Sequence, residues 1–216
     1  AHYPAEYMAA LMTRRFSQIT EITKLMEECQ SMNIKTLGPD INESYRAFGV
    51  NEHGEIRFGL SAIKGMGAPA ADAIVAEREK NGAYKDIFDF AQRVDFSNVN
   101  RKAFESLALS GGFDSFAFQR EQYLAANPKG ETFLDVLVRY GQLFQTEQRE
   151  AQNSLFGGEQ AVEIARPQPV EAEGWSNIEK LNRERDLVGI YISAHPLDEF
   201  SIILNTMCNT HCSELD

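Results

Sequence analysis

The sequence contains little cysteine, no long apolar run and fewer basic than acidic residues. Its three cysteines among 216 residues are too few for a disulfide framework and are typical of a reducing compartment, so we expect a cytoplasmic protein. No stretch comes near the roughly eighteen consecutive apolar residues of a membrane-spanning helix, and the first residues do not resemble a signal peptide. We therefore expect no membrane association.

Metal-binding residues are also scarce. Cys208, His211 and Cys212 lie close together near the end of the sequence, but structural zinc sites use four ligands with paired spacing. Unpaired cysteines near the end of a piece of a longer chain are the simpler interpretation. No pair of carboxylates stands in a setting typical of metal-assisted catalysis. We therefore expect a chain that holds no cofactor and is not catalytic by itself.

Acidic residues outnumber basic ones by 32 to 21, which gives a net charge of −11. A domain that binds duplex DNA on its own normally relies on lysine and arginine. The imbalance is uneven, because 13 of the acidic residues but only 5 of the basic residues follow residue 145. The earlier part of the chain is close to neutral, so we expect it to hold DNA weakly, beside basic surface of a larger protein.

The most informative motif is Lys64-Gly65-Met66-Gly67-Ala68, which lies between two apolar-periodic segments. Two glycines around one apolar residue are typical of a helix-hairpin-helix unit, because both are free to adopt positive φ and neither has a Cβ that holds a ligand away. Pro69 suits the first turn of the second helix. Since N–H groups at a helix start donate to phosphate, the motif predicts contact with a nucleic-acid backbone without sequence reading.

The alternative is a tight helical hairpin without a ligand, since a Gly-x-Gly pattern alone is weak evidence. Lys64 is equally well explained as a solvated surface lysine. A second, more divergent copy has its turn over residues 95–100. Its asparagines adopt left-handed conformations less readily than glycine, so this copy is either a DNA contact or purely structural. The predicted DNA-binding residues are Lys64, Gly65, Met66, Gly67, Ala68, Asn98, Asn100, Arg101 and Lys102.

The pattern of the whole chain predicts a mostly α-helical fold. Within residues 1–46 we expect two amphipathic helices and then a short strand at residues 34–37, and a small β-hairpin with a polar turn follows at residues 48–58. The tandem helix-hairpin-helix copies would pack as a four-helix unit, and further helices complete a DNA-binding domain over residues 47–152. Residues 153–216 begin with proline, glycine and glutamate, which is typical of an acidic linker, and end in further helices.

A short motif stands at the start of that linker. It consists of Gln152, Leu155 and Phe156. Two large apolar side chains in a polar stretch either fold back onto the domain or fill an apolar pocket on a partner, with the glutamine hydrogen-bonded at the rim. Spacing alone leaves both interpretations open.

Taken together, these residues resemble the alpha subunit of bacterial DNA polymerase III, the C-family replicative polymerase. The likeness extends over nearly the whole chain and is sharpest at residues 1–11, 38–44, 56–67, 189–191 and 195–197. The resemblance implies that residues 1–46 are the end of the fingers region and that the hairpins grip duplex DNA behind the active site. It also implies that the linker motif is the Gln-x-x-Leu/Met-Phe motif that binds the sliding clamp.

The resemblance further implies what lies outside this sequence. The polymerase aspartates of the palm, with the Mg²⁺ expected for the parent polymerase, would lie upstream of residue 1, and an oligonucleotide-binding fold would begin after residue 216. The chain is then expected to be a non-catalytic piece of a DNA-directed DNA polymerase. Other replicase subunits would reach it through the parent chain.

Three other interpretations stay open. A DNA-repair protein, such as a nuclease subunit or ligase, also uses helix-hairpin-helix motifs, although the opening helices and the linker motif argue against it. A pure protein-interaction module would bind a basic partner through its acidic tail and would show no DNA binding even at low salt. An error-prone paralogue of the polymerase is the third, and the linker motif disfavours it.

Overall fold

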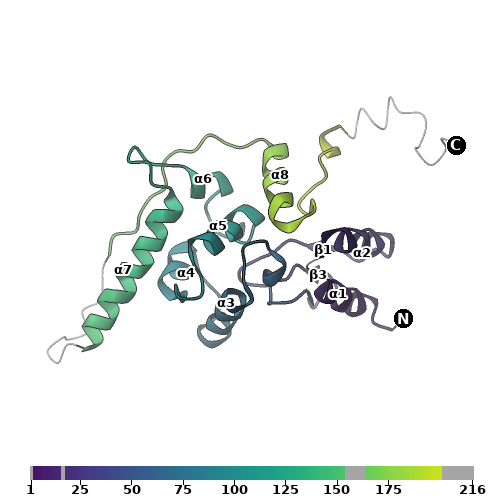
Figure 1. Cartoon of the computed structure of the whole chain (residues 1–216), viewed down its shortest axis with the longest axis horizontal. Coiled ribbons are helices and arrows are strands. Elements are labelled where there is room, and N and C mark those ends of the chain that lie inside the picture. The colour runs from purple at the N-terminus through teal and green to yellow at the C-terminus, as the bar shows by residue number, and fades with distance from the viewer. Residues whose placement is uncertain (1, 16–17, 154–163, 201–216) are drawn as a thin grey trace.

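The computed structural model describes residues 2–15, 18–153 and 164–200. Within these ranges the chain forms eight α-helices and one small three-stranded sheet, which confirms the predicted mostly α-helical class. Figure 1 shows α7 along one edge of the molecule and α1 and α2 at the opposite edge. No helix in the described ranges is long and apolar enough to cross a membrane. The α-helices are α1 (Pro4–Arg14), α2 (Ile19–Ser31), α3 (Ala68–Asn81), α4 (Ile87–Arg93), α5 (Arg101–Ser110), α6 (Arg120–Leu124), α7 (Phe133–Asn153) and α8 (Asn177–Val188).

Three short strands connect the first two helices to the rest of the fold. β1 (Thr36–Leu37) pairs in parallel with β3 (Ile56–Arg57), and β3 pairs antiparallel with β2 (Gly49–Val50). The predicted β-hairpin is therefore confirmed, and the side-chain oxygen of Asn51 accepts two backbone N–H groups within its polar turn. Because α1 packs against β2 and β3, the opening helices share a core with the segment that follows.

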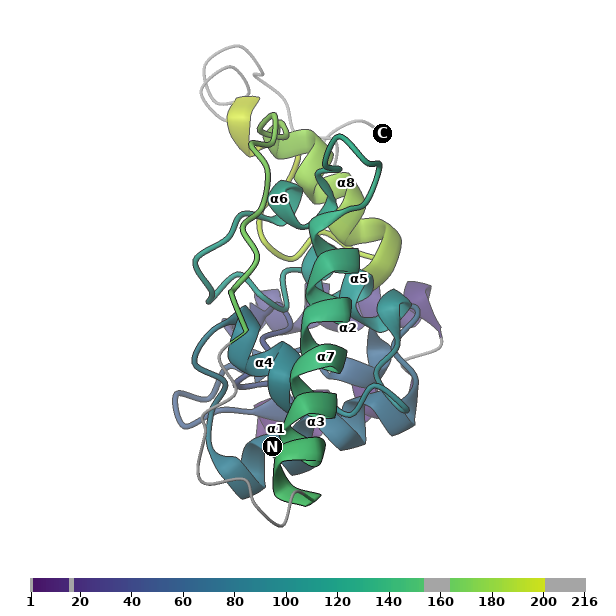
Figure 2. The same ribbon diagram turned by 90° about the vertical axis from the view of Figure 1, so that its left-hand side faces the viewer.

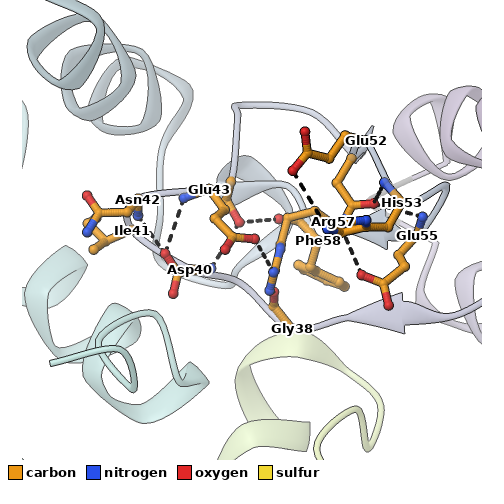
Figure 3. Close-up of polar contacts among 12 residues, drawn as sticks. Gly38, Asp40, Ile41, Asn42, Glu43, Glu52, His53, Glu55, Arg57 and Phe58 are labelled. Atoms are coloured by element: carbon orange, nitrogen blue, oxygen red, sulfur yellow. Dashed lines mark hydrogen bonds and ion pairs between the residues drawn. The ribbon is translucent and has the colours of Figure 1, made fainter. Parts of the chain in front are cut away.

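The loop over residues 38–44 holds β3 in place (Figure 3). Arg57 on β3 donates to the carbonyl oxygen of Gly38 at 2.9 Å and pairs with the carboxylate of Glu43. The hydroxyl of Ser44 donates to the carbonyl oxygen of Phe58 at 2.7 Å, and both groups are buried. Residues 38–44, one of the motifs on which the resemblance rests, thus fix β3. This strand begins a second such motif, residues 56–67.

The first helical segment of the hairpin motif is only a 3₁₀ turn, η1 (Leu60–Ala62). Its apolar pattern predicts a longer helix, but β3 ends at Arg57, only three residues before η1 begins. The N–H groups of Leu60 and Ser61 donate to the carbonyl oxygens of Tyr45 and Arg46, at 2.9 and 3.1 Å, and not to a preceding helical turn. The four-helix unit therefore consists of this 3₁₀ turn and the three α-helices α3, α4 and α5.

Aromatic side chains pack the second hairpin into the core. The ring centroids of Phe90 on α4 and Phe104 on α5 are 5.0 Å apart, and both rings lie within 6.2 Å of Phe113. Phe96, from the turn between the two helices, stacks on Phe104 at 5.9 Å. The predicted second copy is therefore present as a tightly packed helix pair.

The longest helix, α7, lies across α4 (Figure 2). The contact is close because Gly141 faces the backbone of α4. A Cβ at this position would overlap the carbonyl oxygen of Ala91 and would lie 2.7 Å from the ring of Phe96. Residues 146–151 are exposed, so the last turns of α7 extend beyond the body of the molecule.

The described part of the linker, residues 164–176, has no helix or strand but is attached to the body and leads to α8 (Figure 1). Arg166 pairs with Asp86 at 3.0 Å and lies over the ring of Phe88 at 5.1 Å. Beyond α8 the structure describes a final 3₁₀ turn, η2 (Asp198–Phe200). One continuous core runs from α1 to the residues after α8, so the division at residues 46 and 152 stays a prediction.

The close crossing of α7 on α4 predicts an unusual response to substitution. Replacing an exposed helical glycine by alanine normally stabilises a protein by up to about 1 kcal/mol. Gly141→Ala should instead lower the free energy of unfolding by about 1–3 kcal/mol, because the added Cβ overlaps backbone. Urea unfolding measures this, and the control is Gly49→Ala, where a Cβ meets no atom within 4 Å. A Gly141→Ala variant as stable as the wild type would contradict the crossing.

Candidate nucleic-acid interface

The turn of the first hairpin lies directly on α5. Gly65 adopts the positive φ that glycine permits, at 90°. A Cβ at this glycine would lie 2.7 Å from the Oγ atom of Ser106 and 3.3 Å from the Cε atom of Lys102. The missing side chain therefore makes room for α5, whereas the motif alone predicted room for a ligand.

Gly67 has a different role from Gly65. Its φ is −73°, so Gly67 does not adopt the positive φ that glycine permits. Gly67 is the N-cap residue of α3, and a Cβ here would meet only the ring of Pro69, at an ordinary contact distance of 3.6 Å. Pro69 lies in the first turn of the helix, as predicted.

The start of α3 has the features of an anion-binding site. No side chain caps this helix, and its first turn contains no acidic residue. The first N–H groups of a helix have no intrahelical acceptors, and they lie at the positive end of the helix dipole. Gly67 is exposed and Ala68 is half-buried. These backbone N–H groups can therefore donate to a phosphate oxygen.

Lys64 and Lys102 bring positive charge to the same surface. Both residues are exposed, and within the described residues neither forms an ion pair, unlike their neighbour Arg101. The stem of Lys102 passes over Gly65, so the ammonium group of the second hairpin lies next to the first turn. The fold thus places Lys102 of the second hairpin beside the glycine turn of the first hairpin, although the two are separate in the sequence.

The turn of the second hairpin is less suited to phosphate. The side chain of Asn98 donates to the carboxylate of Asp95 at 2.6 Å. Hydrogen bonds from Ser97 lower the pKa of Asp95, so this carboxylate is ionised at neutral pH and repels a phosphate group. Asn100 caps α5 by accepting the N–H of Ala103 at 3.0 Å, which occupies one of the donors at that helix start.

Two further predicted contact residues also have partners within the fold. The side chain of Met66 is buried in the core. Arg101 donates to Asp135 at 2.5 Å and to Glu105 at 2.7 Å, and its hydrogen bond lowers the pKa of Asp135 to about 2. This ion pair persists at neutral pH and leaves Arg101 less available to DNA than Lys102.

Sequence reasoning missed two groups that hold the first hairpin. The Oγ atom of Ser106 donates to the carbonyl oxygen of Lys64 at 2.9 Å, and the N–H of Lys64 donates to the carbonyl oxygen of Leu187 at 2.9 Å. For the first contact, the sequence signal is a serine among the apolar positions of α5, and its side chain is buried in the structure. A backbone carbonyl leaves no such signal for the second.

A hollow of about 460 Å³ lies between α5 and α8, beside Lys102. The lining residues are Asn100, Arg101, Lys102, Glu105, Ser106, Leu109 and Leu187.

The remaining candidate residues are only partly described. The backbone of Gln152 belongs to the last turn of α7, whereas Leu155 and Phe156 lie outside the described residues. The residues considered for zinc, at 208–212, also lie outside them. In the described ranges no three His, Cys, Asp or Glu side chains come together as metal ligands, so the described residues offer no fit for the Mg²⁺ of a polymerase centre.

Comparison with known proteins finds similarity over this surface and beyond it. Residues 33–123, which include both hairpins, match the family described as a helix-hairpin-helix motif. Over 204 residues the chain is 39% identical to the DNA polymerase III subunit alpha of Chlamydia trachomatis. It is 37% identical over 200 residues to that of Pasteurella multocida and 35% identical over 205 residues to that of Escherichia coli.

This chain is homologous to one segment of the DNA polymerase III alpha subunit. The alignments cover 92–93% of the chain, so the similarity includes the regions on both sides of the hairpins. They cover only 16–17% of each relative, so the chain corresponds to a small part of those proteins. The resemblance that the sequence motifs indicated is confirmed.

The different roles of the two glycines can be tested by stability. Gly65→Ala should lower the free energy of unfolding by about 1–3 kcal/mol, because alanine is strained at a φ of 90° and its Cβ meets Ser106. Gly67→Ala is the matched control and should change it by less than about 0.5 kcal/mol. Urea unfolding of both variants measures the difference. Equal losses for the two variants would show that the first turn does not lie on α5.

Proposed function

We propose that this chain is the part of a replicative DNA polymerase that holds the backbone of duplex DNA without reading its sequence. The observation that carries the proposal is the single surface formed by the uncapped start of α3 and the side chains of Lys64 and Lys102. Homology to the polymerase and the helix-hairpin-helix match support a DNA-binding region. Nucleotidyl transfer, with its Mg²⁺, would belong to another part of the longer protein.

The composition of the surface explains why the binding should be weak and non-specific. Backbone N–H groups and lysine ammonium groups recognise phosphate, which fixes a protein on DNA but carries no sequence information. The second hairpin presents the carboxylate of Asp95, so it contributes chiefly through Lys102. The first hairpin is therefore the main contact in this proposal.

Salt dependence tests the DNA proposal. The 216-residue chain should bind duplexes of different sequence with equal, weak affinity. Lys64→Ala and Lys102→Ala should each reduce the slope of log affinity against log salt by about 0.9, since each removes one phosphate contact. Fluorescence anisotropy with a labelled duplex measures this. The control is Lys80→Ala, because Lys80 is in the last turn of α3, about 20 Å along the helix from Gly67.

Two results would decide against this proposal. No binding of the wild-type chain at low salt would favour a protein-interaction module. An equal loss of slope in the Lys80→Ala control would show that the contact depends on overall charge and does not involve the hairpin.

We also propose that Gln152, Leu155 and Phe156 bind a sliding clamp, with the two apolar side chains buried in a pocket of the clamp. The support is the position of the motif. On α7 the amide of Gln145 donates to the carbonyl oxygen of Val94 at 2.8 Å, and residues 146–151, which lead to the motif, are exposed. Arg166, ten residues after the motif, pairs with Asp86 at 3.0 Å.

Replacement of the two anchors tests the clamp proposal. The double variant Leu155→Ala and Phe156→Ala should lose roughly 2–4 kcal/mol of clamp binding free energy, because a few buried apolar anchors carry most of a small interface. Its duplex affinity should be unchanged. The control is Leu197→Ala, which removes an exposed leucine elsewhere. Titration of each variant with a bacterial sliding clamp measures the effect, and full clamp binding by the double variant would disprove the proposal.

A further inference from the structure

Both backbone groups of Lys64 are held by other elements of the fold. Its carbonyl oxygen accepts the hydroxyl of Ser106 on α5, and its N–H donates to the carbonyl oxygen of Leu187 on α8, both at 2.9 Å. The side chain of Lys64 is exposed while its backbone is fixed at two points. The direction in which its ammonium group projects therefore depends on where α8 ends.

A buried ion pair holds α8 in position. Glu184 on α8 is 1% exposed, and its carboxylate lies 3.0 Å from the guanidinium of Arg120 on α6. The other carboxylate oxygen accepts the N–H groups of Ile192 and Ser193, at 2.8 and 2.9 Å. Burial by itself would lower the pKa of Arg120, but its pairing with Asp114 and with Glu184 raises it, so the guanidinium stays charged.

The ion pair and the Leu187 carbonyl are close along the same helix. Leu187 follows Glu184 by three residues, which places the two on one face of α8. The helix ends directly afterwards, where Gly189 has a φ of 87° and donates to the carbonyl oxygen of Arg185 at 2.6 Å. Val188 is fully buried against the core. Because the helix is rigid over this one turn, fixing Glu184 also fixes the Leu187 carbonyl.

We infer that Glu184 and Arg120 are positioning residues for DNA binding: they hold α8 so that the Leu187 carbonyl fixes Lys64 beside Lys102. This inference rests on the proposed DNA contact of the first hairpin. Neither residue touches the proposed phosphate site. On this inference α8 supports the DNA-binding surface, although it contributes no side chain to it. The linker that carries the proposed clamp motif leads directly into this helix.

Glu184→Gln in the 216-residue chain tests the inference, because glutamine keeps an oxygen for Ile192 and Ser193 but loses the charge that pairs with Arg120. The variant should reduce the salt slope of duplex binding by about 0.9, the amount that one phosphate contact contributes. In a Lys64→Ala background the same change should have no further effect, since the contact that it positions is already gone. The control is Glu77→Gln, which breaks the Arg93–Glu77 ion pair in the C-terminal half of α3 and should leave the slope unchanged.

A second readout does not depend on DNA. Glu184→Gln should accelerate hydrogen exchange of the Lys64 amide, measured by NMR on the free chain, whereas Glu77→Gln should not. Gly189→Ala provides a second variant, because it strains the end of α8 with the ion pair intact, and it should have the same two effects. Unchanged exchange at Lys64, or a loss of slope that adds to that of Lys64→Ala, overturns the inference. A wild-type chain that does not bind duplex overturns the proposed function instead.

Discussion

The contact of Gly65 with α5 is the constraint on which the rest of the surface depends. With an ideal Cβ only 2.7 Å from the Oγ atom of Ser106, a side chain at this position requires either the Ser106 side chain or one of the two elements to shift. The close approach lets Ser106 reach the backbone of Lys64 and lets Lys102 lie across the turn. A glycine that would normally be assigned to ligand contact thus serves to join two hairpins. In the proposed function, the start of α3, which follows this glycine, is the part that contacts the ligand.

The fold was predictable where local signals agreed. Pro69 marks the start of α3 and Gly82 marks its end. In the polar turn between β2 and β3, Asn51 forms the hydrogen bonds that such a turn requires. The prediction failed at η1, where apolar spacing indicates a helix but the carbonyl oxygens of Tyr45 and Arg46 accept the first backbone N–H groups. Apolar periodicity reports which residues are buried. It does not report which backbone groups a distant loop has already engaged.

The sequence predicted the hairpin motif of the candidate site, but it did not predict which of the motif's side chains are available on the surface. The sequence presents Arg101 and Lys102 as equivalent basic residues, yet Arg101 is paired with Asp135, which lies 34 residues further along the chain. Met66 looks like part of an exposed turn, yet its side chain belongs to the core. The contact between Lys64 and Leu187 involves backbone alone and has no side-chain pattern. In each case the deciding partner is distant in sequence, so only the fold reveals it.

The net charge of −11 is compatible with a DNA contact because electrostatic forces are local at physiological salt. With a Debye length of about 8 Å, acidic residues far from the hairpin contribute little to the potential at Lys64 and Lys102. Two lysines and one helix start nevertheless give only a weak contact. A weak contact suffices if the longer polymerase and a bound clamp already hold the chain beside the duplex, since tethering raises the effective concentration of the second partner to about the millimolar range. On this view the small charge of the surface suits its proposed task, because a contact that binds phosphate weakly and without sequence preference can be released and remade as the duplex moves.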